Sequence, residues 1–264
     1  MNRLKDIKCF LFDMDGTIYL GNELLPGVAD FFRTLRERGK KFYFVTNNSS
    51  KGHSHYVEKL RKLGIDAQTE DIIISSDALT YYLDREQPKS KLFVLGTPEL
   101  QETISKAGYT IIEDETTRPD LVVVGFDMTL AYQKLARACR WIDQGVPYLA
   151  THGDVRCPIE GGEYLPDSGA ILALIKTATG KEPLIIVGKP NHYIVDLLRD
   201  RGSYARSELA MVGDRLTTDI AFGLNNHILS VLVLTGEGTV AEADRLGIHP
   251  DVILPRAVDI LKYI

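Results

Sequence analysis

Short apolar runs that alternate with amphipathic helical patterns constrain this chain more than any other feature. Runs of strand length occupy residues 7–12, 41–46 and 72–75, and helical patterns occupy residues 26–39 and 51–64. These strand-length runs are mostly apolar and do not alternate regularly with polar residues, which predicts that both faces of each strand are covered. The pattern predicts an α/β fold, with a doubly wound parallel-sheet core of the Rossmann type.

A second series of strands and helices follows and is expected to form an inserted domain. Strand-length runs at residues 92–95, 121–124 and 146–150 are separated by helical patterns, and residues 151–169 are predicted to form a long loop rich in Gly and Pro. Three more strands are expected at 184–187, 209–212 and 230–234. We therefore predict a core domain of residues 1–88 and 183–264, interrupted by an inserted α/β domain of residues 89–182.

Composition narrows the function classes. A net charge of −5 in a chain of 264 residues argues against a nucleic-acid or membrane-surface role, which usually needs a basic face. No apolar run reaches the roughly 18 residues of a membrane helix, and charged residues near the start leave no room for a signal peptide. Three widely spaced cysteines favour reduced thiols. We expect a cytoplasmic protein with no nucleic-acid or membrane partner.

The strongest local motif is a pair of carboxylates directly after the first predicted strand. Asp13 and Asp15 are two positions apart at the carboxyl end of that strand, the edge at which parallel sheets place their sites. A bound cation would keep one carboxylate ionised for nucleophilic attack, while the other could hold a proton. Thr17 offers a hydroxyl to fix a carboxylate. An acidic turn is the simpler alternative, whereas a calcium loop fails because its glycine and glutamate positions fall on Ile18 and Leu24.

A polar segment also follows the second strand. Thr46, Asn47 and Asn48 lead from this strand toward a helix, where hydroxyl groups and free backbone N–H groups suit a phosphate dianion. Ordinary N-capping by Asn48 or the serines after it is the alternative.

Two later strand ends supply a cation and further carboxylates. Lys189, followed by Asn191, could neutralise phosphoryl oxygens, although a single lysine in a turn is more often solvated. Asp214 could complete an oxygen-only Mg²⁺ site, and Asp219 could orient Asp214 or Lys189. An N-cap with an acidic first turn is the alternative for this pair. Taken together, the four strand ends provide a nucleophile, an acid, a hydroxyl, a cation and a metal ligand.

In this order the motifs resemble the haloacid dehalogenase superfamily, and within it the class IIA capped phosphatases of the NagD and p-nitrophenyl phosphatase group. The motifs are D-M-D-G-T from Asp13, T-N-N from Thr46, G-K-P-N from residue 188 and G-D-R-L from residue 213. This resemblance implies a Mg²⁺-dependent phosphatase that hydrolyses a small phosphomonoester, such as a sugar phosphate or a nucleoside monophosphate, through an aspartyl phosphate.

The resemblance assigns roles to the carboxylates. Asp13 would be the nucleophile and a metal ligand, and Asp15 the general acid and base, reaching the metal through its backbone carbonyl. Asp214 would be the third metal ligand, supported by Asp219.

The remaining site residues are implied in the same way. Thr46 and Lys189 would assist catalysis and bind the phosphoryl group, with Asn47, Asn48 and Asn191 as further phosphate-binding candidates.

The inserted domain would close over the substrate and set specificity. Asp127, His152 and Asp154 are the candidate residues for that task, and His152 stands where relatives often carry an amide. Relatives of this type often pair through the inserted domain, so a homodimer is one expected state.

Two alternatives use similar residues. A phosphotransferase or mutase would pass the phosphoryl group to a sugar instead of water. A receiver-like phosphorylation switch also combines acids, a hydroxyl and a lysine, but Asp15 and the large insertion argue against it.

Overall fold

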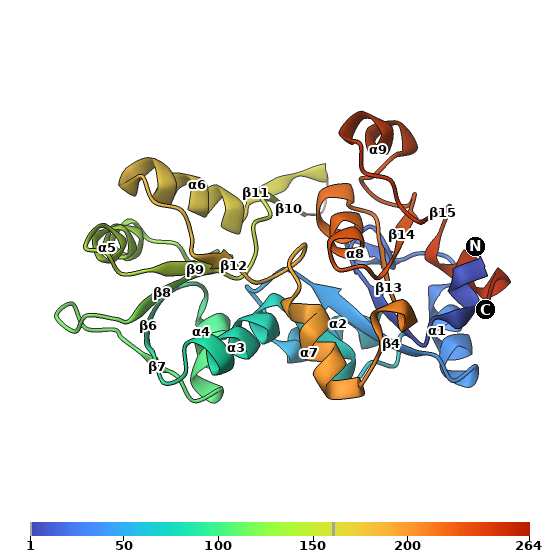
Figure 1. The fold of residues 1–264 in the computed structure, drawn as a ribbon, viewed down its shortest axis with the longest axis horizontal. Coiled ribbons are helices and arrows are strands. Elements are labelled where there is room, and N and C mark those ends of the chain that lie inside the picture. The colour runs from blue at the N-terminus through green and yellow to red at the C-terminus, as the bar shows by residue number, and fades with distance from the viewer. Residues whose placement is uncertain (1, 160–161) are drawn as a thin grey trace. The chain divides into compact units, whose positions relative to one another are not determined.

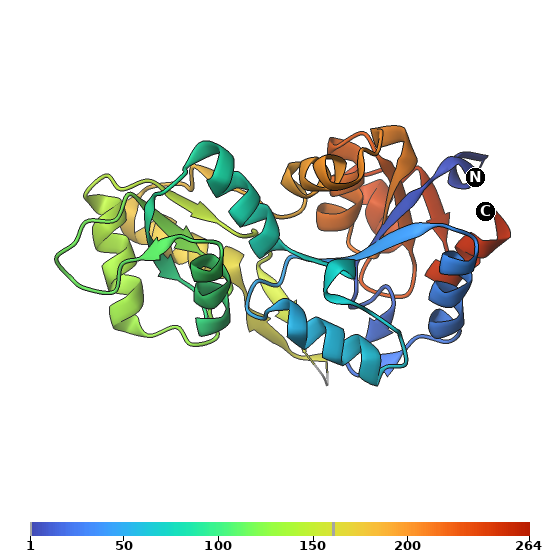
Figure 2. The ribbon, with the colours of Figure 1, turned by 90° about the horizontal axis from the view of Figure 1, so that it is seen from below.

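A parallel sheet of six strands forms the centre of the first of two units (Figures 1 and 2). The computed structural model describes residues 2–159 and 162–264. The first unit contains the described residues up to Thr46, His53–Ile73 and Lys189–Ile264. The second contains Asn47–Gly52 and the described residues of Ile74–Gly188. The fold is therefore the expected α/β class with a parallel-sheet core.

Strand order places the end of β1 at a reversal of the chain. The sheet runs β15-β14-β13-β1-β4-β5, and β1 pairs in parallel with both β13 and β4. Its strands are β1 (Cys9–Phe12), β4 (Lys41–Thr46), β5 (Ile72–Ile74), β13 (Leu209–Gly213), β14 (Leu229–Val233) and β15 (Val252–Leu254). The early strands lie on one side of β1 and the late strands on the other, so the carboxyl end of β1 is the switch point where such sheets place their sites.

Aromatic packing holds the first helix on this sheet. The apolar face of α1 (Val28–Glu37) buries Phe31 and Phe32, and the Phe32 ring centroid lies 5.1 Å from that of Phe12 and 4.8 Å from that of Phe44. Such edge-to-face contacts add to the area that the rings bury. The other elements of this unit are α2 (His53–Lys62), α7 (Tyr193–Gly202), α8 (Ala221–Asn225), α9 (Val240–Leu246), η1 (Asn2–Asp6), η2 (Thr69–Asp71), η4 (Arg206–Glu208), η5 (Leu216–Ile220), η6 (Ala257–Lys262) and the hairpin of β2 (Tyr19–Leu20) and β3 (Glu23–Leu24).

The second unit has its own parallel sheet, in the order β12-β9-β8-β6-β7. Helices α5 and α6 cover one face, where alternate residues such as Val122 and Val124 join one buried cluster, and α3 and α4 lie on the other side (Figure 1). The elements are α3 (Ser75–Glu86), β6 (Lys91–Leu95), α4 (Pro98–Lys106), β7 (Thr110–Ile111), β8 (Leu121–Val124), α5 (Tyr132–Asp143), β9 (Tyr148–Ala150), α6 (Ser168–Thr179) and β12 (Ile185–Ile186).

Two sequence-based expectations need correction here. Residues 151–169, predicted to be a loop, contain the antiparallel strands β10 (Arg156–Pro158) and β11 (Tyr164–Pro166), whose residues are exposed or half-buried, so no buried apolar face marks them. Glu160 and Gly161 of that stretch lie outside the described residues. Strand β12, predicted within the first domain, pairs with β9 of the second sheet. The two units divide after Thr46, Gly52, Ile73 and Gly188. The division into a core of residues 1–88 and 183–264 and an inserted domain of residues 89–182 stays a prediction.

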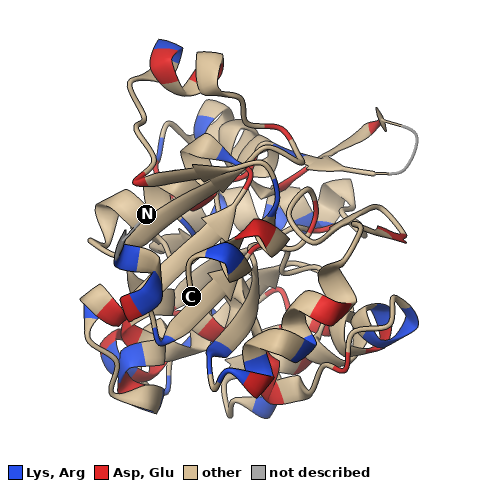
Figure 3. Ribbon diagram, turned by 90° about the vertical axis from the view of Figure 1, so that its right-hand side faces the viewer, with Lys and Arg blue, Asp and Glu red and all other residues tan. Residues whose placement is uncertain are grey.

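Surface and cysteine features agree with the composition. Acidic and basic residues are interspersed along the outer helices (Figure 3). Cys9, Cys139 and Cys157 are free thiols. Within residues 2–159 and 162–264, no helix has the length and apolar character needed to cross a membrane.

Candidate active site

A buried lysine joins two carboxylates at the carboxyl end of the first sheet. The Lys189 Nζ atom lies 2.6 Å from Asp13 Oδ1 and 2.7 Å from Asp219 Oδ1, and it also donates to the carbonyl of Val45 at 3.4 Å. The Lys189 side chain is 1% exposed and that of Asp219 is fully buried. A charged lysine is rarely buried to this degree unless it is paired, so the two ion pairs account for its position.

Local backbone structure places Asp219 beside Lys189. Residues Leu216–Ile220 form a π-helical turn, in which the N–H of Ile220 bonds the carbonyl of Arg215 at 3.1 Å. Asp219 Oδ2 accepts the backbone N–H of Arg215 at 3.1 Å, which leaves Oδ1 for Lys189. Gly213 makes room, because a Cβ at that position would lie 2.4 Å from the Asp219 side chain. Both carboxylate oxygens of Asp219 are thus engaged in orienting its neighbours.

Asp214 is held by a different set of donors. Its Oδ1 accepts the Thr17 hydroxyl at 3.2 Å, and its Oδ2 accepts the backbone N–H of Glu237 at 2.8 Å. The backbone approaches so closely that a Cβ on Gly16 would lie 2.5 Å, and one on Gly236 2.0 Å, from Asp214 Oδ2. Gly16 also has a φ of +81°, which favours glycine. The carboxylate therefore sits in a cradle that side chains at those two positions would fill.

The crowding of carboxylates raises their proton affinity. Burial raises the pKa of Asp13 to about 8, with further contributions from the charges of Asp219 and Asp214, and Lys189 opposes the shift only in part. Burial and the charge of Asp219 likewise raise the pKa of Asp214 to about 6. For Lys189, burial disfavours the charged form, but Asp13 and Asp219 more than offset it and raise its pKa. One lysine does not neutralise three acids, so the site favours an additional cation.

The donor set fits a hard divalent cation. Carboxylate oxygens of Asp13, Asp214 and Asp219 lie within 4.8 Å of one another. Oxygen donors are those that Mg²⁺ and Ca²⁺ prefer. Asp219 is already paired with the Lys189 ammonium and with the Arg215 backbone, whereas Asp214 accepts only from uncharged donors and Asp13 bonds Lys189 through Oδ1. Asp13 and Asp214 are therefore the better placed ligands.

The second carboxylate of the motif sits beside this cluster in a partly exposed position. Asp15 is joined to Tyr19 through an isolated β-bridge, and burial raises the pKa of its carboxyl group, against the charge of Lys59 and a bond from the backbone N–H of Gly21. A carboxyl group with a raised pKa is suited to holding a proton.

Thr46 and Asn191 are the other predicted site residues that belong to the first unit. Thr46 is the buried last residue of β4, which neighbours β1 with Phe12 opposite Phe44. Asn191 is half-buried between Lys189 and the start of α7.

Asn47 and Asn48 belong to the second unit by their contacts. Asn47 Nδ2 donates to Asp154 Oδ2 at 3.3 Å, and the Asn47 carbonyl accepts the hydroxyl of Ser75 at 2.5 Å. Asn48 Oδ1 accepts both the backbone N–H and the hydroxyl of Ser50, at 3.0 and 2.7 Å. The Asn48 amide oxygen therefore stabilises a local turn that precedes α2, which begins at His53.

Asp127 is engaged inside the second unit. Its fully buried carboxylate pairs with Lys134 at 2.6 Å and accepts the backbone N–H and hydroxyl of Thr129 at 2.9 and 2.7 Å. Lys134 also donates to the carbonyl of Gly96. These bonds hold the Asp127 carboxylate within a turn of the second unit.

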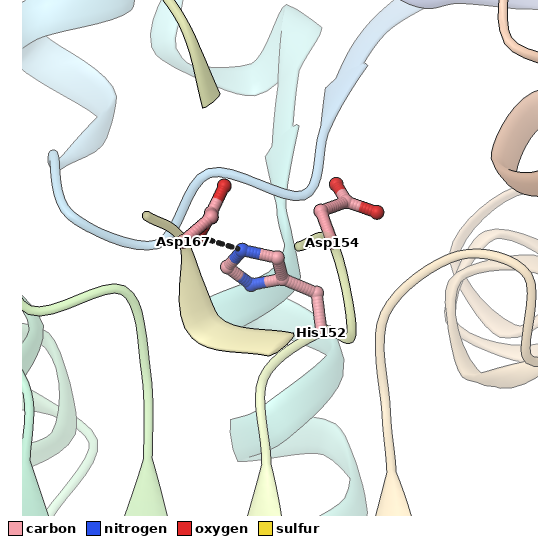
Figure 4. Close-up of side chains that lie close together, drawn as sticks. All are labelled: His152, Asp154 and Asp167. Carbon is pink, nitrogen blue, oxygen red and sulfur yellow. Dashed lines mark hydrogen bonds and ion pairs between the residues drawn. The ribbon is translucent and has the colours of Figure 1, made fainter. Parts of the chain in front are cut away.

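His152 and Asp154 lie together with an acid that the sequence did not single out. His152 is fully buried, and its Nε2 atom lies 2.8 Å from Oδ1 of Asp167, the N-cap of α6 (Figure 4). The half-buried Asp154 turns its carboxylate away from the imidazole (Figure 4). Donor atoms of the three residues are close enough to hold a metal. The direct hydrogen bond between His152 and Asp167 already uses two of them, so a cation is not needed to explain the cluster.

Comparisons with known proteins agree with this geometry. A family profile described as haloacid dehalogenase-like hydrolase matches residues 10–110, and a second, HAD-hydrolase-like profile matches residues 186–260. The chain is 33% identical over 259 residues to an acid sugar phosphatase of Staphylococcus saprophyticus, covering 98% of both chains.

Solved structures show the same relationship. A 4-nitrophenylphosphatase from Thermotoga maritima superimposes with a TM-score of 0.93 at 40% identity, covering 99% of both chains. NagD from E. coli K-12 gives a TM-score of 0.86 at 28% identity, covering 96% of this chain and 98% of that one. A glycerol phosphate phosphatase of Mycobacterium tuberculosis, solved with calcium and with magnesium, gives a TM-score of 0.89 at 29% identity; in the magnesium complex the match covers 99% of this chain and 78% of that one.

The resemblance read from the motifs is thereby confirmed: this chain belongs to the haloacid dehalogenase-like hydrolases, in the NagD and p-nitrophenyl phosphatase group of phosphomonoester hydrolases.

Proposed function

We propose that this protein is a Mg²⁺-dependent phosphatase that transfers the phosphoryl group of a small sugar or polyol phosphate to Asp13 and then to water. The observation that carries the proposal is the bridge of Lys189 between Asp13 and Asp219, beside the Asp214 carboxylate. This arrangement puts a potential nucleophile, a buried cation and further oxygen donors within one cluster.

The first half-reaction uses the two acids of the motif. Asp13 Oδ attacks phosphorus, the bond between phosphorus and the ester oxygen breaks, and protonated Asp15 gives its proton to the leaving alcohol. The ammonium group of Lys189 offsets negative charge on the transferring oxygens, and the Thr46 hydroxyl donates to one of them. The raised pKa of Asp15 supports its assignment as the acid.

The second half-reaction returns the enzyme to its starting state. Asp15, now ionised, takes a proton from water as that water attacks phosphorus, and the bond to Asp13 breaks to release inorganic phosphate. Asp219 holds Lys189 in place throughout through its 2.7 Å ion pair.

Magnesium is the proposed metal. The Asp13 and Asp214 carboxylates and the backbone carbonyl of Asp15 would hold it, and when bound it would offset the negative charge that develops on the phosphoryl group. The raised pKa values of Asp13 and Asp214 support a cation here, as does the relative crystallised with magnesium.

Sugar phosphates are the proposed substrate class because relatives are described as acid sugar phosphatases and a glycerol phosphate phosphatase. The second unit is proposed to act as the cap that selects among them. The expected homodimer stays a prediction, which light scattering during size-exclusion chromatography would check. The cytoplasmic location likewise stays a prediction.

The direct test measures phosphate release from p-nitrophenyl phosphate with Mg²⁺, with Ca²⁺ and with EDTA. Wild type should turn over only with Mg²⁺, and Asp13→Asn should lose turnover, while Asp244→Asn, a change at an exposed acid of α9, should not. Undiminished turnover by Asp13→Asn would refute the mechanism.

A panel of hexose, pentose, glycerol and nucleoside phosphates would then test the substrate class. Transfer of the phosphoryl group to an added sugar, with a matching decrease in the inorganic phosphate formed, would instead favour the phosphotransferase alternative. Equal kcat/KM for nucleotides and sugar phosphates would argue against the proposed class.

A further inference from the structure

The chain passes between the two units at four points, and one turn of the second unit contacts the first of these, the entry at Asn47, and the last, the exit at Gly188. At the entry, Asn47 Nδ2 donates to Asp154 Oδ2 at 3.3 Å. At the exit, the backbone N–H of Gly188 donates to the Thr151 carbonyl at 2.7 Å. A Cβ on Gly188 would lie 2.5 Å from that carbonyl and 3.1 Å from the Cβ of His152, so the backbone is packed directly against the turn. We call residues 151–154 the crossing turn.

Each connection continues directly into a residue proposed to bind the phosphoryl group. Asn47 follows Thr46, and Gly188 precedes Lys189. Consecutive Cα atoms are held about 3.8 Å apart by the peptide bond, so a displacement of Asn47 or Gly188 is passed to its neighbour. The crossing turn is therefore linked through one covalent step to Thr46 and through another to Lys189.

His152 is the residue that fixes the crossing turn from inside. Its Nε2 atom lies 2.8 Å from Asp167 Oδ1, which also accepts the backbone N–H of Ser168 at 2.5 Å. The opposite ring nitrogen, Nδ1, lies 2.9 Å from the Thr151 hydroxyl, and that hydroxyl lies 3.0 Å from the hydroxyl of Ser49. All five residues are buried.

These contacts agree with the following assignment of donors and acceptors along the chain of hydrogen bonds. A carboxylate oxygen accepts, so the imidazole carries its proton on Nε2 and donates to Asp167. Nδ1 then accepts from Thr151, and Thr151 accepts from Ser49. In this order each hydroxyl proton and the ring proton is used, which is the favourable arrangement for buried polar groups. Ser49 belongs to the same entry segment as Asn47, so the chain of bonds also ties that segment to the turn.

We propose that His152, as the neutral Nε2–H tautomer, is a positioning residue that sets the places of Thr46 and Lys189 by holding the crossing turn against Asn47 and Gly188. The proposal rests on the phosphate-binding roles given above to Thr46 and Lys189. His152 acts through the crossing turn and not by contact with substrate or metal.

The hydrogen-bond order can be tested without any activity. In ¹⁵N-labelled wild type at pH 7, two-bond ¹H–¹⁵N correlation spectra, assigned by their loss in His152→Gln, should show one histidine with a protonated Nε2 and an unprotonated Nδ1. A protonated Nδ1 on His152 would overturn the proposed order. This measurement stands whether or not the protein proves to be a phosphatase.

The positioning role is tested with Thr151→Val and His152→Gln, compared with His249→Gln, which changes an exposed histidine. Thr151→Val keeps the shape of the side chain and removes the hydroxyl between Ser49 and His152. His152→Gln retains an amide donor for Asp167 but lacks the Nδ1 acceptor. Both should lower kcat/KM for p-nitrophenyl phosphate by about 10- to 100-fold, the usual effect of losing a supporting hydrogen bond or misplacing a binding group.

The inhibition constant of inorganic phosphate separates positioning from a general structural defect. Phosphate meets the same binding groups, so its inhibition constant should rise in both variants at a temperature where far-UV circular dichroism shows them fully folded. In the variant that carries both Thr151→Val and His152→Gln, kcat/KM should fall no further than in the more impaired single variant, because both changes break one hydrogen-bond network. Unchanged phosphate inhibition and kcat/KM in a folded Thr151→Val would overturn the proposal. If wild type binds no phosphate at all, the proposed function fails first, and the tautomer result still stands.

Discussion

Replacing the proposed nucleophile should stabilise the metal-free protein while it abolishes turnover. Burial and the neighbouring carboxylates raise the pKa of Asp13 to about 8 from 3.8. A folded-state pKa above the unfolded value means that the folded protein holds its proton more tightly, so ionisation favours unfolding. Asparagine has no charge to lose. Asp13→Asn should therefore remove a destabilising contribution that is absent below pH 3.8, grows as the pH rises, and is constant above pH 8.

The size of the stability difference follows from the interval between the two pKa values of Asp13, 3.8 and about 8. Each pKa unit corresponds to about 1.4 kcal/mol, so the gain in the free energy of unfolding should be about 2 kcal/mol at pH 5, about 4 kcal/mol at pH 7 and about 6 kcal/mol at pH 9. With Mg²⁺ at 100 times its dissociation constant, wild type should regain about 2.7 kcal/mol because only the folded site binds the ion. The variant, lacking one ligand, should regain less.

Urea unfolding in EDTA at the three pH values, followed by far-UV circular dichroism, gives the assay. Trp141 is the single tryptophan and lies in the second unit, so its fluorescence provides an internal reference for the unit that the substitution does not touch. Asp244→Asn serves as the matched control, since its exposed carboxylate should leave both signals unchanged.

A variant that is no more stable than wild type at pH 9 would refute this reasoning. A difference that does not grow between pH 5 and pH 9 would also refute it, because the effect would then not arise from ionisation of Asp13.

Two further changes test the packing around the carboxylates. Gly236→Ala should displace Asp214, because its Cβ would lie 2.0 Å from Oδ2; we expect at least a tenfold loss of Mg²⁺ affinity, in the range seen for disturbed metal ligation, measured by Mg²⁺ titration of activity. Gly52→Ala, where a Cβ meets nothing within 4 Å, is its control and should behave as wild type. Lys134→Met should leave the buried Asp127 without its cation and cost about 3–5 kcal/mol, measured by urea unfolding; a loss below 1 kcal/mol would contradict the buried ion pair.

Much of the fold could be predicted because its strands are buried on both faces. The stretch Lys41–Thr46 was predicted with the bounds that the structure shows, since it is apolar, β-branched or aromatic, and flanked by turn residues. The strands β10 and β11 were missed for the opposite reason: none of their residues is buried, so no apolar period marks them. Strand β12 was recognised, but its partner sheet depends on pairing and not on local pattern.

The candidate site divides in the same way. Asp13 and Asp214 were singled out because each follows a strand, and β1 and β13 are parallel neighbours that bring their carboxyl ends to one edge. Lys189 also follows a strand, but that strand, β12, belongs to the second sheet, so only the folded structure shows that Lys189 reaches Asp13 and Asp219. Asp167 gave no such signal, since an aspartate before a helix is an ordinary N-cap. Only its contact with a buried imidazole from a different segment reveals a second use.

The sequence by itself determined the parallel-sheet class, the family and the set of chemical groups, because apolar periodicity and motif order are local properties of the chain. The tertiary structure decided which groups meet. The distances from Lys189 to Asp13 and Asp219, the glycine cradle around Asp214, and the attachment of Asn47 and Gly188 to the crossing turn all join residues far apart in sequence. Such contacts depend on how strands pair and turns pack, and no local pattern encodes them.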